Sequence, residues 1–252
     1  MSESVKELVS IIMPNYNGAK YVRESIDSII AQSYENWELL FVDDCSTDES
    51  LKIVESYNDK RIRILQNETN LGAAISRNNA IREAKGKWIA FLDSDDVWDK
   101  DKLSKHLEYM SKNQVEFSCT SYFVVDEQNK PIKEFAPAKD AYGYYDILKH
   151  CYIGCSTVIY DCEKIGKVYA PENAPKREDF ACWLSILKDG KKVACFHDSL
   201  TTYRLRKGSV SSNKFGLIKY QWNVLRRVEK ISVIKSAYYM AYWAIKGFLK
   251  YR

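Results

Sequence analysis

The chain has 252 residues, of which 46% are hydrophobic, and a formal net charge of +4. This length and composition allow a large core in one domain or in two fused halves, and they exclude a low-complexity or repeat protein. Seven cysteines without C-x-x-C spacing and three histidines without ligand spacing disfavour a zinc site and a disulfide framework.

Three apolar segments in the first hundred residues are typical of buried strands. They cover residues 9–14, 37–42 and 88–92, and amphipathic helical stretches at about 20–32, 48–57 and 72–85 lie between them. Strands and helices in alternation imply parallel pairing with right-handed crossovers. We therefore predict an α/β fold with a mostly parallel central sheet flanked by helices.

Each of these strands runs into a polar loop. The carboxyl ends of parallel strands lie along one edge of the sheet, where ligands bind, so we expect five loop residues to be neighbours: Pro14, Tyr16, Asp44, Asp93 and Asp95. Crowded carboxylates need a cation or hydrogen-bond donors, and hard oxygen ligands suit Mg²⁺ or Mn²⁺. An isolated D-x-D would indicate a solvated acidic turn or a helix cap, but the convergence of three loops favours a metal site.

The sequence lacks the two common glycine-rich phosphate-binding motifs. No two glycines are spaced as G-x-G, and no G-K-[ST] is present, which excludes a dinucleotide fingerprint and a P-loop. A phosphate would therefore be held by a metal and by basic side chains. The segment 70–80 opens a helix and carries Arg77, which on its own would be read as a surface charge.

Four motifs in order resemble the inverting family-2 glycosyltransferases with a GT-A fold. They are S-I-I-M-P-N-Y-N, V-D-D-C-S-T-D, N-x-G-A-A-x-S-R-N-x-A and F-L-D-S-D-D, and the resemblance covers residues 8 to about 100. It implies that residues 1–100 bind a nucleotide-diphosphate sugar, usually a UDP-sugar. It also implies that Pro14 and Tyr16 line the base pocket and that Asp44 accepts a hydrogen bond from uracil.

The same resemblance assigns roles to the diphosphate end of the donor. Arg77 is expected near the nucleotide, and Asp93 near the ribose or the donor sugar. Asp95 is expected to ligate the Mn²⁺ or Mg²⁺ ion that bridges the diphosphate.

Residues 101–213 are expected to form the acceptor-binding half of the same domain. Strand-like runs at 116–125, 154–160 and 192–197 suit a continuation of the same sheet. Glu178 and Asp179 precede an apolar helical pattern, where acidic side chains also favour the helix dipole. Similar enzymes carry an E-D pair here, and its aspartate deprotonates the acceptor hydroxyl. The resemblance therefore assigns Asp179 as the general base rather than a cap.

The segment 203–211 resembles the Y-R-x-H-x-x-S-x-S segment of the family, which closes over the diphosphate. Arg206 occupies the usual histidine position, so a histidine metal ligand is missing. Arg204, Arg206 and Lys207 are cations that would neutralise the departing UDP. A basic surface loop is the alternative interpretation.

Residues 214–252 are predicted to form a basic, aromatic helical tail with amphipathic character. From Arg204 onward the chain has twelve Lys or Arg residues and one acid, Glu229. Lys235, Lys246 and Lys250 fall in one helical stripe beside a broad apolar face, which is typical of a helix lying on an anionic membrane. The alternatives are a homodimer interface or packing on the catalytic domain, and nucleic acid is a poorer partner.

Together these patterns predict transfer of a hexose from a UDP-sugar to a saccharide hydroxyl. The tail suggests an undecaprenyl-diphosphate-linked acceptor in bacterial O-antigen, capsule or teichuronic acid synthesis. Residues 1–8 are polar and charged, unlike a signal peptide, so we expect a cytoplasmic protein on the inner face of the cell membrane. Two other interpretations remain: a catalytically inactive nucleotide-sugar-binding scaffold, and a sugar-nucleotide pyrophosphorylase, which should carry an N-terminal glycine-rich signature.

Overall fold

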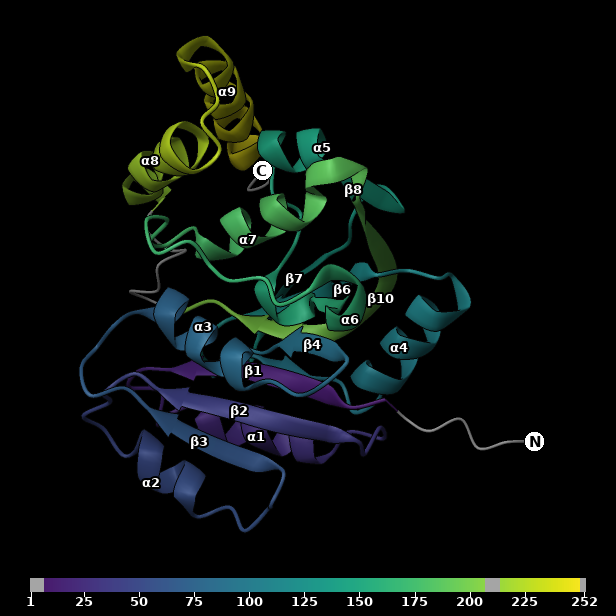
Figure 1. Ribbon diagram of the computed structural model, residues 1–252. Coiled ribbons are helices and arrows are strands. Elements are labelled where there is room, and N and C mark those ends of the chain that lie inside the picture. The colour runs from purple at the N-terminus through teal and green to yellow at the C-terminus, as the bar shows by residue number, and fades with distance from the viewer. Residues whose placement is uncertain (1–6, 207–213, 250–252) are drawn as a thin grey trace.

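The computed structural model describes residues 7–206 and 214–249 (Figure 1). The strands are β1 (Val9–Asn15), β2 (Trp37–Asp43), β3 (Ile62–Gln66), β4 (Trp88–Phe91), β5 (Val97–Trp98), β6 (Phe117–Val125), β7 (Pro131–Phe135), β8 (Ala141–Gly143), β9 (Ile159–Asp161) and β10 (Lys192–Arg204). The α-helices are α1 (Val22–Ile30), α2 (Ser50–Glu55), α3 (Ala73–Glu83), α4 (Lys102–Lys112), α5 (Tyr144–Lys149), α6 (Cys162–Ile165), α7 (Glu178–Leu187), α8 (Lys214–Asn223) and α9 (Val233–Leu249). Shorter turns are η1 (Cys155–Thr157), η2 (Lys188–Gly190) and the π-helical η4 (Val224–Val228).

One sheet joins the strands of the described residues, in the order β3-β2-β1-β4-β9-β6-β10-β5, with β7 beside β6 and β8 beside β10. The first four strands of this order are mutually parallel, as the sequence predicts. Beyond β4 the pairs of β9 with β4 and with β6 are antiparallel, while β6 and β10 are parallel. The sheet is thus parallel where the nucleotide is expected and mixed as a whole.

The structure differs from the predicted strands in two places. β3 was not predicted; it is a short strand at one end of the sheet, and its side chains are mostly half-buried. Residues 154–160 were predicted to form one strand, whereas the structure has the η1 turn followed by β9. That turn brings the side chain of Ser156 toward the end of β4.

Alternation along β1 separates two hydrophobic layers. Val9, Ile11 and Met13 pack on the side of α1, α2 and α4, whereas Ile12 packs on the side of α3 and α7. All four side chains are fully buried. Helices therefore cover both faces of the parallel strands, and the strand ends are left as the open edge.

The predicted helical tail is present and consists of two helices. α8 and α9 meet at η4, whose Val224 and Leu225 are fully buried against the main core (Figure 1). Glu229 accepts a hydrogen bond of 2.5 Å from the Tyr144 hydroxyl and forms an ion pair of 3.1 Å with Lys188. One side of the tail is therefore fastened to the catalytic domain.

The outer side of α9 is apolar and exposed. Ile234 is 84% exposed, Ile245 is 60% exposed and Tyr238 is 54% exposed. Lys235 is exposed beside them, Lys246 lies within α9, and Lys250 lies outside the described residues. None of the helices among the described residues has the length and apolar character needed to span a bilayer.

Candidate active site

Pro14 and Tyr16 lie at the carboxyl end of β1. Ile12 O accepts a hydrogen bond from Leu92 N, so the backbone polar groups of Ile12, and of every second residue from it along β1, point toward β4. Pro14 is one of these residues, and it lies beyond the last pair that β1 makes with β4. A proline is tolerated there because its missing N–H leaves no ladder bond unmade. Tyr16 is the first residue after β1 and is 50% exposed, which leaves its aromatic ring available to a base at this edge of the sheet.

Asp44 holds the loop that precedes α3. Its Oδ1 accepts from Asn67 Nδ2 at 2.8 Å and from Leu71 N at 2.9 Å, and its Oδ2 accepts from Gly72 N at 2.8 Å. Gly72 adopts φ +85°, a conformation that glycine reaches without steric cost. A carboxylate offers about four acceptor positions, so Oδ2 retains one for a further donor. The predicted contact with uracil is compatible with this geometry.

Arg77 joins the two halves of the site. Its Nη2 lies 2.6 Å from Asp93 Oδ1, and its Nη1 lies 2.9 Å from Glu178 Oε1. Arg77 is 9% exposed, and the charges of Asp93 and Glu178 raise the pKa of its guanidinium despite burial. Burial raises the pKa of Glu178, and Arg77 offsets part of that effect. The predicted nucleotide neighbour is thus the link between the D-x-D loop and the E-D pair.

The D-S-D-D loop is held by η1. Ser156 Oγ accepts a hydrogen bond from Asp93 N at 3.1 Å and donates to Asp96 Oδ2 at 2.5 Å. Asp96 is fully buried, and burial, reinforced by the charges of Asp95 and Asp93, raises its pKa well above the usual range. Asp96 is therefore a structural anchor, and Asp93 and Asp95 stay the carboxylates of the loop that are predicted to face a ligand.

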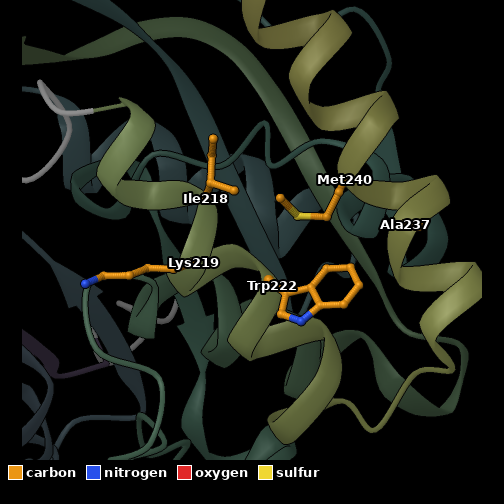
Figure 2. A pocket seen from close by; sticks show the side chains of 5 residues that line it. All are labelled: Ile218, Lys219, Trp222, Ala237 and Met240. Atoms are coloured by element: carbon orange, nitrogen blue, oxygen red, sulfur yellow. The ribbon is translucent and has the colours of Figure 1, made fainter.

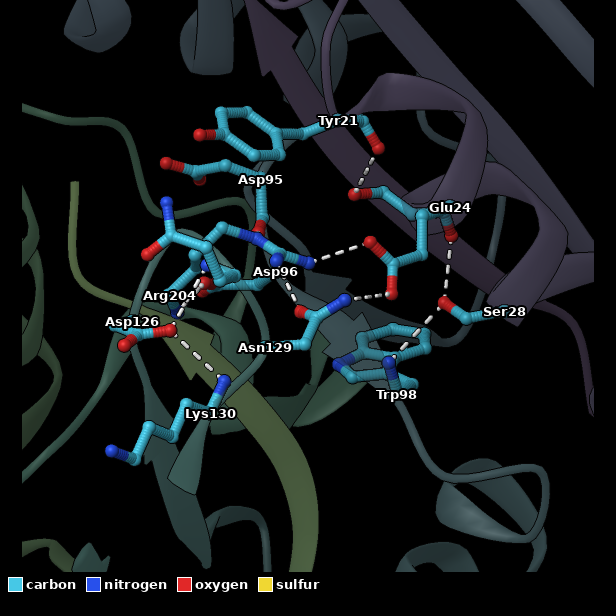
Figure 3. Close-up of polar contacts among 12 residues, drawn as sticks. Tyr21, Glu24, Ser28, Asp95, Asp96, Trp98, Asp126, Asn129, Lys130 and Arg204 are labelled. Atoms are coloured by element: carbon cyan, nitrogen blue, oxygen red, sulfur yellow. Dashed lines mark hydrogen bonds and ion pairs between the residues drawn. The ribbon is translucent and has the colours of Figure 1, made fainter. Parts of the chain in front are cut away.

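Arg204 is buried beneath this loop (Figure 3). The residue is 3% exposed, and its guanidinium donates to Asp95 O at 3.0 Å, to Glu24 Oε2 at 2.6 Å and to Asn129 Oδ1. These partners engage three of its five N–H donors, so Arg204 positions the loop that carries Asp95. A direct contact between Arg204 and a nucleotide stays a prediction.

Arg206 occupies a different environment, since its side chain is 35% exposed. Its Nε lies 2.5 Å from Asp95 Oδ2, the carboxylate expected to bind the metal. Burial raises the pKa of Asp95, as does the charge of Asp93, whereas Arg206 lowers it. Arg206 is therefore the cation that neutralises Asp95 in this structure. Lys207, its predicted companion, lies outside the described residues.

Asp179 begins α7 beside Glu178. Its Oδ1 accepts a hydrogen bond of 2.6 Å from Phe180 N, and its Oδ2 has no hydrogen-bond partner within the part of the chain that the structure describes. Arg177 rather than Asp179 is the N-cap of α7, and Asp179 lies in the first turn of the helix with one oxygen bonded to the next N–H and the other without a partner in the described part of the chain. Glu178, by contrast, is engaged by Arg77.

Two residues at this site escaped the sequence analysis. Cys155 is half-buried, and desolvation together with the charges of Asp93, Asp179 and Glu178 raises the pKa of its thiol against the opposing charge of Arg77, so the thiol lies among the charged groups of both halves. Ser156 is the hydroxyl that ties Asp93 to Asp96. The motif G-C-S-T was read as part of a strand, and only the η1 turn brings these side chains to the end of β4.

The donor set around the D-S-D-D loop fits a small divalent cation. Within residues 7–206 and 214–249, no three His, Cys, Asp or Glu side chains converge as a metal cage. Mg²⁺, however, is commonly held by one or two carboxylates together with substrate phosphates and water. Asp93 and Asp95 are two such carboxylates, and their mutual repulsion would be relieved by a cation.

Comparison with known proteins identifies the family of this chain. The model of the family described as Glycosyl transferase family 2 matches residues 10–162. This range includes the loops after β1, β2 and β4 and the η1 turn, but not Arg204 or Arg206. TuaG of Bacillus subtilis, a protein named for teichuronic acid biosynthesis, is 41% identical over 241 residues, with 95% of each chain covered. WfgD of Escherichia coli is 40% identical over 245 residues, covering 97% of this chain and 95% of its own. The name of WfgD describes a β-1,3-glucosyltransferase with UDP-Glc as donor and α-D-GlcNAc-diphosphoundecaprenol as acceptor.

Solved structures show the same fold at lower identity. TarS 1–349 of S. aureus, in complex with UDP-GlcNAc, superposes with a TM-score of 0.70 at 23% identity, covering 93% of this chain and 70% of TarS. The mannosyltransferase PcManGT of Pyrobaculum calidifontis, in complex with GDP-Man and Mn²⁺, gives a TM-score of 0.68 at 17% identity, covering 94% and 70%. The predicted GT-A architecture is confirmed.

Proposed function

The chain belongs to glycosyl transferase family 2, and from that premise we propose that it is an inverting hexosyltransferase using a UDP-sugar and a lipid-diphosphate-linked saccharide acceptor. One observation carries the proposal: Arg77 contacts Asp93 of the D-x-D loop and Glu178 of the E-D pair at once. The groups expected to hold the donor and those expected to activate the acceptor therefore share one small site.

In the proposed reaction, Asp179 is the general base. Its Oδ2 takes the proton of an acceptor hydroxyl while the oxygen of that hydroxyl bonds to the anomeric carbon of the hexose. The bond from the anomeric carbon to the phosphate oxygen of UDP breaks on the opposite face, and the electron pair leaves with UDP. Attack from the face opposite the leaving group inverts the anomeric configuration.

The remaining residues are assigned to the donor. Tyr16 and Pro14 would contact the base, and the open acceptor position of Asp44 would take the N–H of uracil. Asp95, together with Asp93, would hold Mn²⁺ or Mg²⁺, which supplies positive charge to the diphosphate when bound. Arg206 is a partly exposed cation beside Asp95 and would neutralise the leaving UDP.

The acceptor class and the location rest on the relatives and on the tail. WfgD and WfaP, both of Escherichia coli, carry names that describe transfer to a diphosphoundecaprenol-linked sugar. The apolar outer side of α9 beside Lys235 suits an anionic membrane surface. We assign the protein to bacterial surface polysaccharide synthesis, peripheral on the cytoplasmic face of the membrane.

The experiment that tests this proposal measures UDP release from a panel of UDP-hexoses, with and without a lipid-diphosphate GlcNAc acceptor. An active transferase releases UDP in an acceptor-dependent manner and forms a product with the inverted anomeric configuration. Binding of UDP-sugars without acceptor-dependent release would instead identify an inactive nucleotide-sugar-binding scaffold.

A further inference from the structure

The facing sides of α8 and α9 form an apolar groove of about 640 Å³ (Figure 2). Its lining residues are Ile218, Lys219, Trp222, Ala237 and Met240. Ile218, the Trp222 ring and Met240 lie around its centre, whereas the Lys219 chain runs outward and carries its ammonium away from them. The volume lies within the range of ordinary small-molecule sites, roughly 300–1,000 Å³.

Two other residues of α8 contact the segment that carries the general base. Gln221, which is 1% exposed, accepts a hydrogen bond of 2.8 Å from Arg177 Nε, and Arg177 immediately precedes Glu178 and Asp179. Asn223 Nδ2 also donates to Asn173 O at 2.5 Å. The groove is therefore one helix away from the catalytic pair, with Gln221 and Trp222 as neighbours on the shared helix.

The charge of the tail sequence and one lining residue favour an anionic occupant. Residues 214–252 carry nine Lys or Arg and a single acid, Glu229, and Lys219 lines the groove itself. An occupant of this groove should therefore combine an apolar body with a negatively charged end.

We propose that the groove binds the first isoprene units of a polyprenyl-diphosphate-linked acceptor, with Lys219 near the diphosphate. This inference rests on the acceptor class of the proposed function and adds a binding site to it. Only a diphosphate separates the lipid chain from the first sugar of such an acceptor. An enzyme acting on that sugar must contact the lipid near its diphosphate end. The α8–α9 groove supplies an apolar surface on the helix that contacts Arg177, two residues before Asp179.

A chain buried here would contribute strongly to affinity, since each methylene removed from water changes binding by roughly a factor of four. The exposed outer side of α9 would lie against the bilayer, while the groove takes the single lipid that carries the substrate. These two surfaces use different residues of α9, so they can be tested separately.

The experiment measures binding of farnesyl diphosphate by calorimetry, with saturating UDP present to occupy the donor site. Wild-type protein should bind it at least ~10-fold more tightly than Trp222→Ala and Ala237→Trp, which remove and fill the apolar space respectively. Ile234→Ala is the matched control, because Ile234 is exposed on α9 but does not line the groove, and it should bind as wild type does. Inorganic diphosphate should bind all four proteins equally weakly.

Equal affinity of all four proteins for farnesyl diphosphate, or no binding at all, would overturn the groove assignment. A concentration-dependent dimer that Trp222→Ala abolishes and Ile234→Ala preserves would identify a second copy of this chain as the occupant instead. This assay involves no sugar transfer, so its outcome is independent of the UDP-release test. Far-UV circular dichroism and UDP binding verify that each variant is folded.

Discussion

Glu178 is tied to Arg77 through a contact of 2.9 Å, while its neighbour Asp179 keeps one carboxylate oxygen free of hydrogen bonds within the described part of the chain. Two adjacent acids at the start of one helix thus have different environments. The ion pair holds Glu178, and the proposed base Asp179 has an oxygen to which an acceptor hydroxyl could donate.

The first prediction separates these two acids. Asp179→Asn retains the size of the side chain and its capping oxygen, but it cannot accept a proton, so kcat should fall ~10²-fold or more with UDP binding intact. Glu178→Gln still accepts a hydrogen bond from Arg77 and should lose less. Steady-state kinetics checks both variants, and equal losses would leave Asp179 without a distinct role.

A second prediction concerns the metal. Excess EDTA should abolish transfer, and Mn²⁺ or Mg²⁺ should restore it in wild-type protein but not in Asp95→Ala. Titration of Mn²⁺ monitored by electron paramagnetic resonance, in the presence of UDP, should show weaker binding to that variant. Full activity in excess EDTA would contradict the assignment of Asp95. Asp101→Ala, which changes an acid on the nearby loop before α4, serves as the control.

The tail gives a third prediction. Lys235, Lys246 and Lys250 changed together to Glu should release the protein from anionic liposomes, because each basic residue near such a surface contributes about 1 kcal/mol. High salt should weaken binding of the wild type in the same sedimentation assay. Changing Lys60, Lys105 and Lys112 to Glu reverses the same charge at exposed positions around α2 and α4. If both triple variants bind alike, α9 does not provide the contact.

A buried lysine gives the fourth prediction. Lys102 is fully buried, where its Nζ lies 2.7 Å from His106 Nδ1 and donates to Thr157 O at 2.9 Å. Burial lowers the pKa of Lys102 to about 7. The unfolded chain, in which lysine titrates near its usual pKa of ~10.4, therefore binds more protons than the folded protein between these two values, so stability should rise with pH across this window.

The size of the effect can be isolated with Lys102→Met. Relative to this variant, wild-type protein should gain a few kcal/mol, as an order-of-magnitude estimate, in free energy of unfolding from pH 7 to pH 9.5. Urea denaturation at the two pH values measures the difference. The subtraction removes the contribution of tyrosines and cysteines common to both proteins. A difference that stays constant with pH would mean that Lys102 keeps an ordinary pKa.

The parallel half of the sheet was predictable because its strands are apolar and each ends in a distinctive polar motif. β3 was not, since Ile62–Gln66 is only five residues long and Arg63 interrupts its apolar run, so the segment lacks the continuous apolar character of the other parallel strands. Residues 154–160 were misread because β-branched and small residues suit both a strand and a tight turn.

The burial of individual arginine side chains could not be predicted from the sequence either. Arg204 and Arg206 stand two positions apart in one basic motif, yet one is buried beneath the Asp95 loop and the other is partly exposed. Burial is decided by partners distant in sequence, such as Glu24 and Asn129. Likewise, the sequence predicts a helical tail, and only the structure shows the break between η4 and α9 and the burial of Val224 and Leu225 against the core.

The hydrogen bonds of Ser156 limit how this enzyme could be recombined with its relatives. A chimera joined near residue 100 would pair the Asp93–Asp96 loop with a foreign η1 turn, and would depend on a hydroxyl in the new partner at that position. A junction after β9, at Asp161, keeps loop and turn together and coincides with the end of the family match at residue 162. Exchange of acceptor preference between members of the family should therefore succeed more often with crossovers on the later side of this turn.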